Sequence, residues 1–310
     1  MAEPAPRSPI IPGNSKDRTG TAGILRRARA EIRKRYAAAL ADILAAFDSI
    51  PVYQVNDLRG PEVRYGLTPQ QLAGIAEELQ QALARWITDE RRVEHVFWWD
   101  RYVDDASHLG TVQASTNLAA LSPVYAAART LEAVLYSEPY RTRIALAKFK
   151  SYEHWTGLAA DERSALAQLI GQAVADGKNP RAVRTMISDR MEVGRSKAAQ
   201  WAQTDITDTL RQARWSEDDA AEAELGVRTG ELWTSAFLPT TRHWHASRSG
   251  RVYTREQVRA FYAERGNRYN CHCSQTACLL DEAGRPILSK KAQSTLANER
   301  KAWQSVHDKG

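Results

Sequence analysis

The feature that most constrains the fold is a change in hydrophobic periodicity at Gly226. Before this point, apolar residues recur at steps of three, four and seven, which is the spacing of amphipathic helices. The clearest stretch runs from Thr21 to about Ile50 and carries the stripe Leu25, Ile32, Tyr36, Leu40, Ile43, Leu44 and Phe47. Pro51 ends it, because proline interrupts a helix. A non-helical connector is expected over residues 51–67.

Capping residues mark further helices in the first two thirds of the chain. Thr68 and Gln71 form a capping box with Pro69 between them, and Asn179-Pro180 opens another helix in a similar way. The spacing also predicts helices over 115–149, with breaks near the two prolines, and over 161–176. A long helix is expected after Gly194, with the apolar stripe Ala198, Trp201, Ala202, Ile206, Leu210 and Ala213.

Beyond Gly226, short alternating stretches replace the helical pattern. VRTGELWTSAF and RVYT read as strands, Thr254 and Gln257 form a capping box for a helix, and a basic helix is expected from Ser289 to about Val306. The prediction is therefore a mainly α fold, in which a long-helix N-terminal region precedes a small α+β module and a final helix. Its parts are a flexible basic arm (1–20), a helical domain (21–225), the α+β module (226–288) and a basic C-terminal helix and tail (289–310).

The charge is unevenly distributed along the 310 residues. Residues 1–36 carry nine Lys or Arg against three acids, and residues 241–310 carry thirteen against six, so the middle of the chain is acidic although the net charge is +6. Basic ends on an acidic body suggest contact with a polyanion such as DNA. The candidate phosphate-binding residues are Arg26, Arg27, Arg29, Arg33, Lys34, Arg35, Lys290 and Lys291. No apolar run is long enough to span a membrane, and the N-terminus does not resemble a secretory signal.

All three cysteines lie in one stretch, NRYNCHCSQTAC, between Asn267 and Cys278. Thiolates and imidazoles are zinc ligands, and His245, Cys271 and Cys273 are the best candidates for a structural zinc site. The Cys-x2-Cys pair of common zinc modules is absent, however. The stretch could instead supply a catalytic thiol, which needs a nearby base, or small apolar side chains for a compact core.

The order of motifs in the last third resembles the phage Mu F-like head morphogenesis family, the minor head proteins of tailed bacteriophages. The matching pieces are Trp233-Thr234-Ser235, Thr241-Arg242-His243-Trp244-His245, Gly250-Arg251-Val252 and Cys271-His272-Cys273, preceded by a long helix with Gln203-Thr204-Asp205. The resemblance covers about residues 195–285. The chain departs from the family pattern in three places. Leu238 and Thr240 stand where the family often has an acid and an arginine. Cys-His-Cys replaces the family's Cys-Arg-Cys, and Asp205 replaces a glutamate.

The resemblance implies a minor capsid protein that is made in the host bacterial cytoplasm and carried into the virion, in the head interior or at the portal vertex. The implied partners are the portal protein, the major capsid or scaffold proteins and, without sequence specificity, double-stranded DNA; no membrane is involved. The implied roles are head morphogenesis, viral assembly and DNA packaging. Catalytic residues are not expected, because Leu238 stands where a carboxylate would assist His245. Two alternatives remain open: a zinc-supported nucleic-acid-binding module, and a nuclease or toxin-type enzyme.

Overall fold

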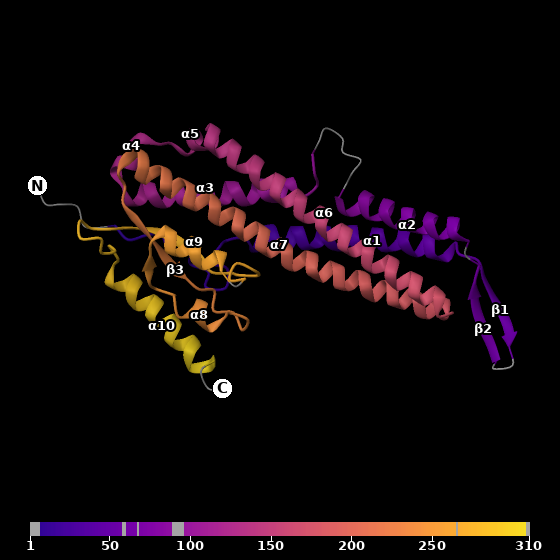
Figure 1. The fold of residues 1–310 in the computed structure, drawn as a ribbon. Coiled ribbons are helices and arrows are strands. Elements are labelled where there is room, and N and C mark those ends of the chain that lie inside the picture. The colour runs from indigo at the N-terminus through magenta and orange to yellow at the C-terminus, as the bar shows by residue number, and fades with distance from the viewer. Residues whose placement is uncertain (1–6, 58–59, 67, 89–95, 265, 308–310) are drawn as a thin grey trace, which may run out of the picture. The chain divides into compact units, whose positions relative to one another are not determined.

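A computed structural model describes residues 7–57, 60–66, 68–88, 96–264 and 266–307 of the chain (Figure 1). The described part is predominantly helical, with a two-stranded hairpin and a small three-stranded sheet, which confirms the predicted fold class. The helices are α1 (Ala22–Asp48), α2 (Pro69–Leu83), the short π-helical segment η1 (Ala84–Thr88), α3 (Asp100–Leu121), α4 (Pro123–Ala128), α5 (Leu131–Leu135), α6 (Glu138–Ala175), α7 (Pro180–Leu225), α8 (His243–Ala246), α9 (Arg255–Ala263) and α10 (Lys290–His307). No helix among the described residues is long and apolar enough to cross a bilayer.

The chain divides into two compact units. Unit 1 holds residues 1–26, 101–147 and 203–310, and unit 2 holds residues 27–100 and 148–202. The predicted border at residue 225 follows the change in periodicity, but the division by contacts cuts through α1, α6 and α7 instead. Long helices can contribute to two cores, because each turn packs against whatever neighbour lies beside it.

Unit 2 is built from most of α1, from α2 and η1, and from parts of α6 and α7. Its core contains the aromatic cluster Trp98, Trp99 and Trp155, whose rings meet at centroid distances of 4.8–5.4 Å. The predicted capping box of α2 is present, with the Thr68 and Gln71 side chains bonded to each other's backbone. The connector after α1 is a β-hairpin, in which β1 (Val52–Asp57) pairs with β2 (Gly60–Tyr65) in antiparallel register.

Two predicted helix borders are wrong. The helix expected over 161–176 is the second half of the continuous α6, and Gly194 lies inside α7 rather than between two helices. Gly194 occurs inside the helix because the Glu162 side chain approaches its backbone closely. A Cβ at this position would lie 2.3 Å from a carboxylate oxygen of Glu162, which is ion-paired with Arg190 at 3.0 Å. Glycine here serves packing and does not end the helix.

In unit 1, the α+β module is organised around a sheet of order β4-β3-β5, with β3 (Thr229–Thr234), β4 (Val252–Tyr253) and β5 (Ser274–Leu279). β3 and β4 confirm the predicted strands, and the capping box that opens α9 is present. The sequence did not predict β5. Its register with β3 pairs Trp233 with Gln275 and Thr229 with Leu279. Buried polar residues on both faces of β5 hide the alternation by which a strand is usually recognised.

Helices α3 and α7 support this sheet within unit 1. They meet where a Cβ on Gly110 would lie 2.5 Å from the Leu210 carbonyl oxygen and 2.9 Å from the Ala213 Cβ, so only glycine fits. Leu118 and Ala277 lie in one buried cluster with Ala221 and Val227, which connects both helices to β5.

The N-terminal segment differs from the predicted flexible arm over the residues that the structure describes. Residues 7–20 are non-helical but lie against the body of unit 1. Arg18 is buried and donates to the Ser235 carbonyl at 3.4 Å, and the Ile10 backbone N–H donates to Asn117 at 2.8 Å. A buried guanidinium with protein partners is a structural anchor, so Arg18 does not belong to a free basic arm. Residues 1–6 of the predicted arm and 308–310 of the predicted tail lie outside the described residues.

Candidate metal centre

The histidine of the predicted zinc site is held by a short helix that is tied to the end of β3. Arg242 precedes α8, and His245 lies in it with only 2% of its surface exposed. The His245 carbonyl accepts a hydrogen bond of 2.8 Å from the Ser235 hydroxyl, and the Ser249 hydroxyl accepts one of 3.2 Å from the Ser235 backbone N–H. Ser235 therefore fixes α8 and the turn after it against the sheet.

The two cysteines enter from the segment that leads into β5. Asn270 has a φ of 50°, a left-handed conformation that asparagine tolerates better than most residues, and its backbone N–H donates to the Thr204 hydroxyl at 2.9 Å. The buried Arg211 of α7 donates to the carbonyls of Cys271 and Cys273, at 3.1 and 3.2 Å. Both thiols face His245.

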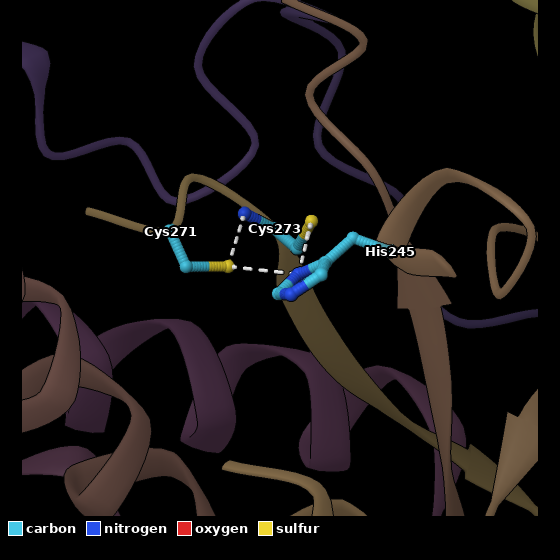
Figure 2. A group of neighbouring side chains, drawn as sticks. All are labelled: His245, Cys271 and Cys273. Carbon is cyan, nitrogen blue, oxygen red and sulfur yellow. Dashed lines mark hydrogen bonds between the residues drawn. The ribbon is translucent and has the colours of Figure 1, made fainter. Parts of the chain in front are cut away.

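The three side chains meet in a compact group (Figure 2). The His245 Nδ1 lies 3.4 Å from the Cys271 Sγ and 3.8 Å from the Cys273 Sγ, and all three donor atoms lie within 4.8 Å of one another. In a tetrahedral zinc site, Zn–S of about 2.3 Å and Zn–N of about 2.05 Å put a sulfur and a nitrogen about 3.6 Å apart. The two observed separations lie on either side of this value. The donor set could therefore hold a metal ion.

The pKa values of the two thiols are shifted in opposite directions. Burial acts to raise the pKa of Cys271, but a hydrogen bond from Cys273 and the charge of Arg211, with His245, outweigh it and hold this pKa well below its ordinary value. The hydrogen bond to Cys271, together with burial, raises the pKa of Cys273 well above its ordinary value. The pair thus shares one proton, and a cation that replaced this proton would find two sulfur ligands.

The other ring nitrogen of His245 faces an arginine. Arg242 Nη1 lies 3.4 Å from Nε2, and the same guanidinium donates to the carbonyls of Asn267 and Tyr269, at 3.1 and 2.9 Å. Arginine has only donors, so Nε2 accepts here and Nδ1 carries the ring proton toward the sulfurs. A metal on Nδ1 would move the proton of a neutral imidazole to Nε2, and Arg242 would then have to withdraw from that nitrogen.

A small cavity of about 60 Å³ adjoins the three donors. It is lined in addition by Thr240, Thr241, Arg242, Asn270 and His272. His245 also packs edge-on against Phe261 at 4.9 Å and Trp233 at 6.0 Å, and the Tyr262 hydroxyl lies 3.6 Å from the Cys271 sulfur. A three-ligand site of this kind has room for a water molecule or a further ligand as the fourth donor.

The third cysteine does not belong to the group. Cys278 lies in β5 beside Leu232 and Leu296, and its sulfur is 3.4 Å from the Ile287 carbonyl. Burial raises the pKa of its thiol to about 12, so it remains a neutral core side chain. Sequence inspection also missed Arg211, which fixes both cysteine carbonyls. The only signal for it was a polar stripe at helical spacing, Thr204, Asp208 and Arg211.

The predicted phosphate-binding residues lie on helix surfaces and are not part of this centre. Arg26, Arg27, Arg29, Arg33 and Lys34 are exposed on α1, and Lys290 and Lys291 are exposed at the start of α10. The structure corrects the prediction that Arg35 binds phosphate. Its guanidinium lies 4.4 Å from the Trp98 ring, pairs with Glu31 at 2.9 Å and donates to the Trp86 carbonyl at 3.0 Å. These internal contacts remove Arg35 from a DNA-binding surface.

Comparison with known proteins adds no relative: no family model, no curated protein and no solved structure matches this chain.

Proposed function

We propose that this chain is a minor head protein of a tailed bacteriophage, which associates with the portal during head morphogenesis. The proposal starts from the motif order that resembles the phage Mu F-like family. The observation that carries it is that the separate motif pieces form one hydrogen-bonded unit. A motif that arose by chance would have no reason to be assembled in this way.

Backbone hydrogen bonds connect the first and third pieces. The Trp233 N–H donates to the Arg251 carbonyl at 2.9 Å, and the Gly250 N–H donates to the Trp233 carbonyl at 2.8 Å. Gly250 has a φ of 79°, which glycine adopts without strain. Ser235 joins the first piece to His245 of the second, and His245 contacts Cys271 and Cys273 of the fourth. All four pieces therefore support one fold.

In this role the protein acts through binding. It would be made in the host cytoplasm, enter the procapsid with the portal and stay in the head interior or at the portal vertex, where the major capsid or scaffold proteins are also its neighbours. An enzymatic role is not part of the proposal, because the ring nitrogen of His245 that points away from the thiols faces Arg242. A general base in a thiol enzyme is usually oriented by an acceptor at that position.

Portal association is the direct test. The full chain, co-expressed with the portal protein encoded in the same phage genome, is expected to co-purify with it and to co-sediment with procapsids. Portal from an unrelated phage, co-expressed in the same way, is the control. A chain that is absent from procapsids assembled in its presence would contradict the proposal.

DNA contact is a further part of the proposal and rests on the seven exposed basic residues of α1 and α10. Each cation that neutralises a phosphate contributes about −0.9 to the slope of log affinity against log salt concentration. Changing Arg33 and Lys34 together to glutamine is therefore expected to make this slope less steep by about 1.8 in filter-binding titrations. Arg285→Gln, which removes an exposed arginine outside the set, should leave the slope unchanged. Equal slopes for all three proteins would remove α1 from the interface.

A second proposal concerns the metal centre. We propose that His245, Cys271 and Cys273 bind zinc, because two thiolates and an imidazole form a borderline-soft donor set with near-tetrahedral separations. When bound, zinc would supply a cross-link between α8 and the segment before β5. The residues themselves orient the donors: Ser235 holds the His245 backbone, and Arg211 holds both cysteine carbonyls. This role is compatible with a head protein and equally with a zinc-supported nucleic-acid-binding module.

A further inference from the structure

A second cavity in unit 1 is lined by none of the three candidate metal ligands and lies between α3, α7, the edge strand β5 and the N-terminal segment. Its volume is about 220 Å³. The walls are largely apolar and include Ile10, Val112, Ala114 and Ala277. Ile10 is 49% exposed and marks the solvent side of the cavity. The space is large enough for a small organic molecule.

The polar lining of this cavity contains buried oxygens that have no hydrogen-bond partner. Asp218, Gln275 and Thr276 all line it and are at most 8% exposed. One oxygen of each side chain, Asp218 Oδ1, Gln275 Oε1 and Thr276 Oγ1, is buried and has no hydrogen-bond partner. Buried polar atoms are normally paired, so these oxygens favour a ligand that brings N–H donors.

The donors that already line the cavity are used elsewhere. Arg214 donates to the Gln113 carboxamide oxygen at 2.9 Å and to the Gln275 carbonyl at 2.8 Å. Asn117 donates to the Ala277 carbonyl at 2.9 Å, and its own oxygen accepts from the Ile10 backbone. These side chains therefore cannot satisfy the unpaired oxygens without giving up existing bonds.

The charges around Asp218 are balanced only while its carboxyl group shares a proton with a second one. Asp218 of α7 lies beside the buried Glu231 of β3, and the two carboxyl groups interact with each other through a side-chain hydrogen bond. Arg255 of α9 is also near, but it is paired with Asp219 at 2.7 Å and with Glu222. Glu217, on the same helix, adds negative charge and is paired with Arg129. Arg214 is thus left beside two carboxyls, whose charge it balances only while they share a proton.

We propose that this cavity binds a small organic cation, a primary ammonium on a short apolar stem, with its charge at Asp218 and its stem against the apolar wall. An ammonium has three N–H donors and no acceptor, which suits a site whose unpaired atoms are all oxygens that can accept. Its charge would balance the second carboxyl. This proposal does not depend on the head-protein function or on zinc.

Binding would be linked to pH. Burial raises the pKa of Asp218 to about 7 and that of Glu231 well above its ordinary value, so without a ligand the pair retains a proton. The cation would take the place of that proton. Affinity should therefore rise with pH through the neutral range, by close to tenfold per pH unit where one proton is released, and level off only above the raised pKa of Glu231.

The test is calorimetric titration of the purified full chain with isopentylammonium chloride, and with isopentanol as the uncharged probe of the same shape. The expected result is saturable binding of the amine, at least tenfold tighter than that of the alcohol, with the pH dependence described above. Equal affinity for both probes, or no saturable binding of the amine at millimolar concentration, would overturn the proposal and assign the unpaired oxygens to water.

Two variants locate the site. Asp218→Asn keeps the shape of the side chain and should lower amine affinity at least tenfold while abolishing the pH dependence. Ala114→Leu fills the apolar wall and should weaken both probes without removing the preference for the amine. The thermal unfolding of each variant is measured in parallel, and a folded Asp218→Asn protein that binds the amine as tightly as the parent would refute the role of Asp218.

Discussion

Cys271→Ser is expected to abolish stoichiometric zinc binding. The parent chain, purified in the presence of zinc, should retain about one equivalent, because thiolate and imidazole donors lie at near-tetrahedral separations before any metal is added. The variant loses one of the three donors, and a serine hydroxyl is a poor substitute for a thiolate at neutral pH. Elemental analysis after dialysis measures the metal content directly. Competition with a chromophoric chelator gives the affinity.

Cys278→Ser is the matched control, since it removes a buried thiol of the same stretch that lies outside the donor group. It should retain zinc even if its stability falls. A chelator should lower the melting temperature of the parent and of Cys278→Ser, because a metal that binds only the folded state stabilises it. It should leave Cys271→Ser unchanged. Equal zinc content in the two variants, or a parent without zinc, would exclude His245, Cys271 and Cys273 as a zinc site.

Trp233→Ala is expected to destabilise the C-terminal module more than any surface substitution. Trp233 is fully buried, stacks on Tyr262 at 5.4 Å, meets Phe261 edge-on at 5.1 Å and donates from its indole nitrogen to Ser235 at 3.2 Å. Removal of a buried tryptophan side chain costs about 3–5 kcal/mol. The freed Ser235 would also hold α8 less firmly. The free energy of unfolding, followed by denaturant titration of the full chain, measures this loss.

Trp244→Ala provides the comparison within the same motif. Trp244 is 55% exposed and donates to the Asn267 side chain at 2.9 Å. Its removal should cost about 1 kcal/mol, the contribution of one hydrogen bond near the surface. If both substitutions lowered stability equally, Trp233 would not be the centre of the module core. Trp233→Phe should recover part of the loss, because it restores a ring but not the indole donor.

Much of the helical fold could be predicted from sequence because its causes are local. The stripe of α1 and the two capping boxes depend on residues a few positions apart, and all three are present in the structure. The interruption predicted at Gly194 failed because a glycine inside a helix can reflect close packing as well as a break. The Glu162 carboxylate that needs this space lies 32 residues earlier in the chain.

The sequence alone also could not show which basic residues are available to bind DNA. Arg18 and Arg35 resemble their neighbours in sequence, yet one is buried against unit 1 and the other lies on the Trp98 ring. Their partners are distant in sequence, so composition alone could not separate them from Arg33 and Lys34. Strand β5 was missed for a related reason, because its polar side chains are buried by neighbours that only the assembled sheet provides.

The sequence by itself determined the helical character of the region before Gly226, the change of architecture at that residue and the identity of three candidate metal ligands. Only the tertiary structure decided that these ligands meet, since His245 lies 26 residues before Cys271 and is brought to it by Ser235, Arg211 and the pairing of β3 with β5. Tertiary structure also revealed the acceptors around the second cavity, which no sequence pattern marks. Local periodicity reports which side of one element is buried. Proximity and unsatisfied hydrogen bonding depend on how several elements pack together.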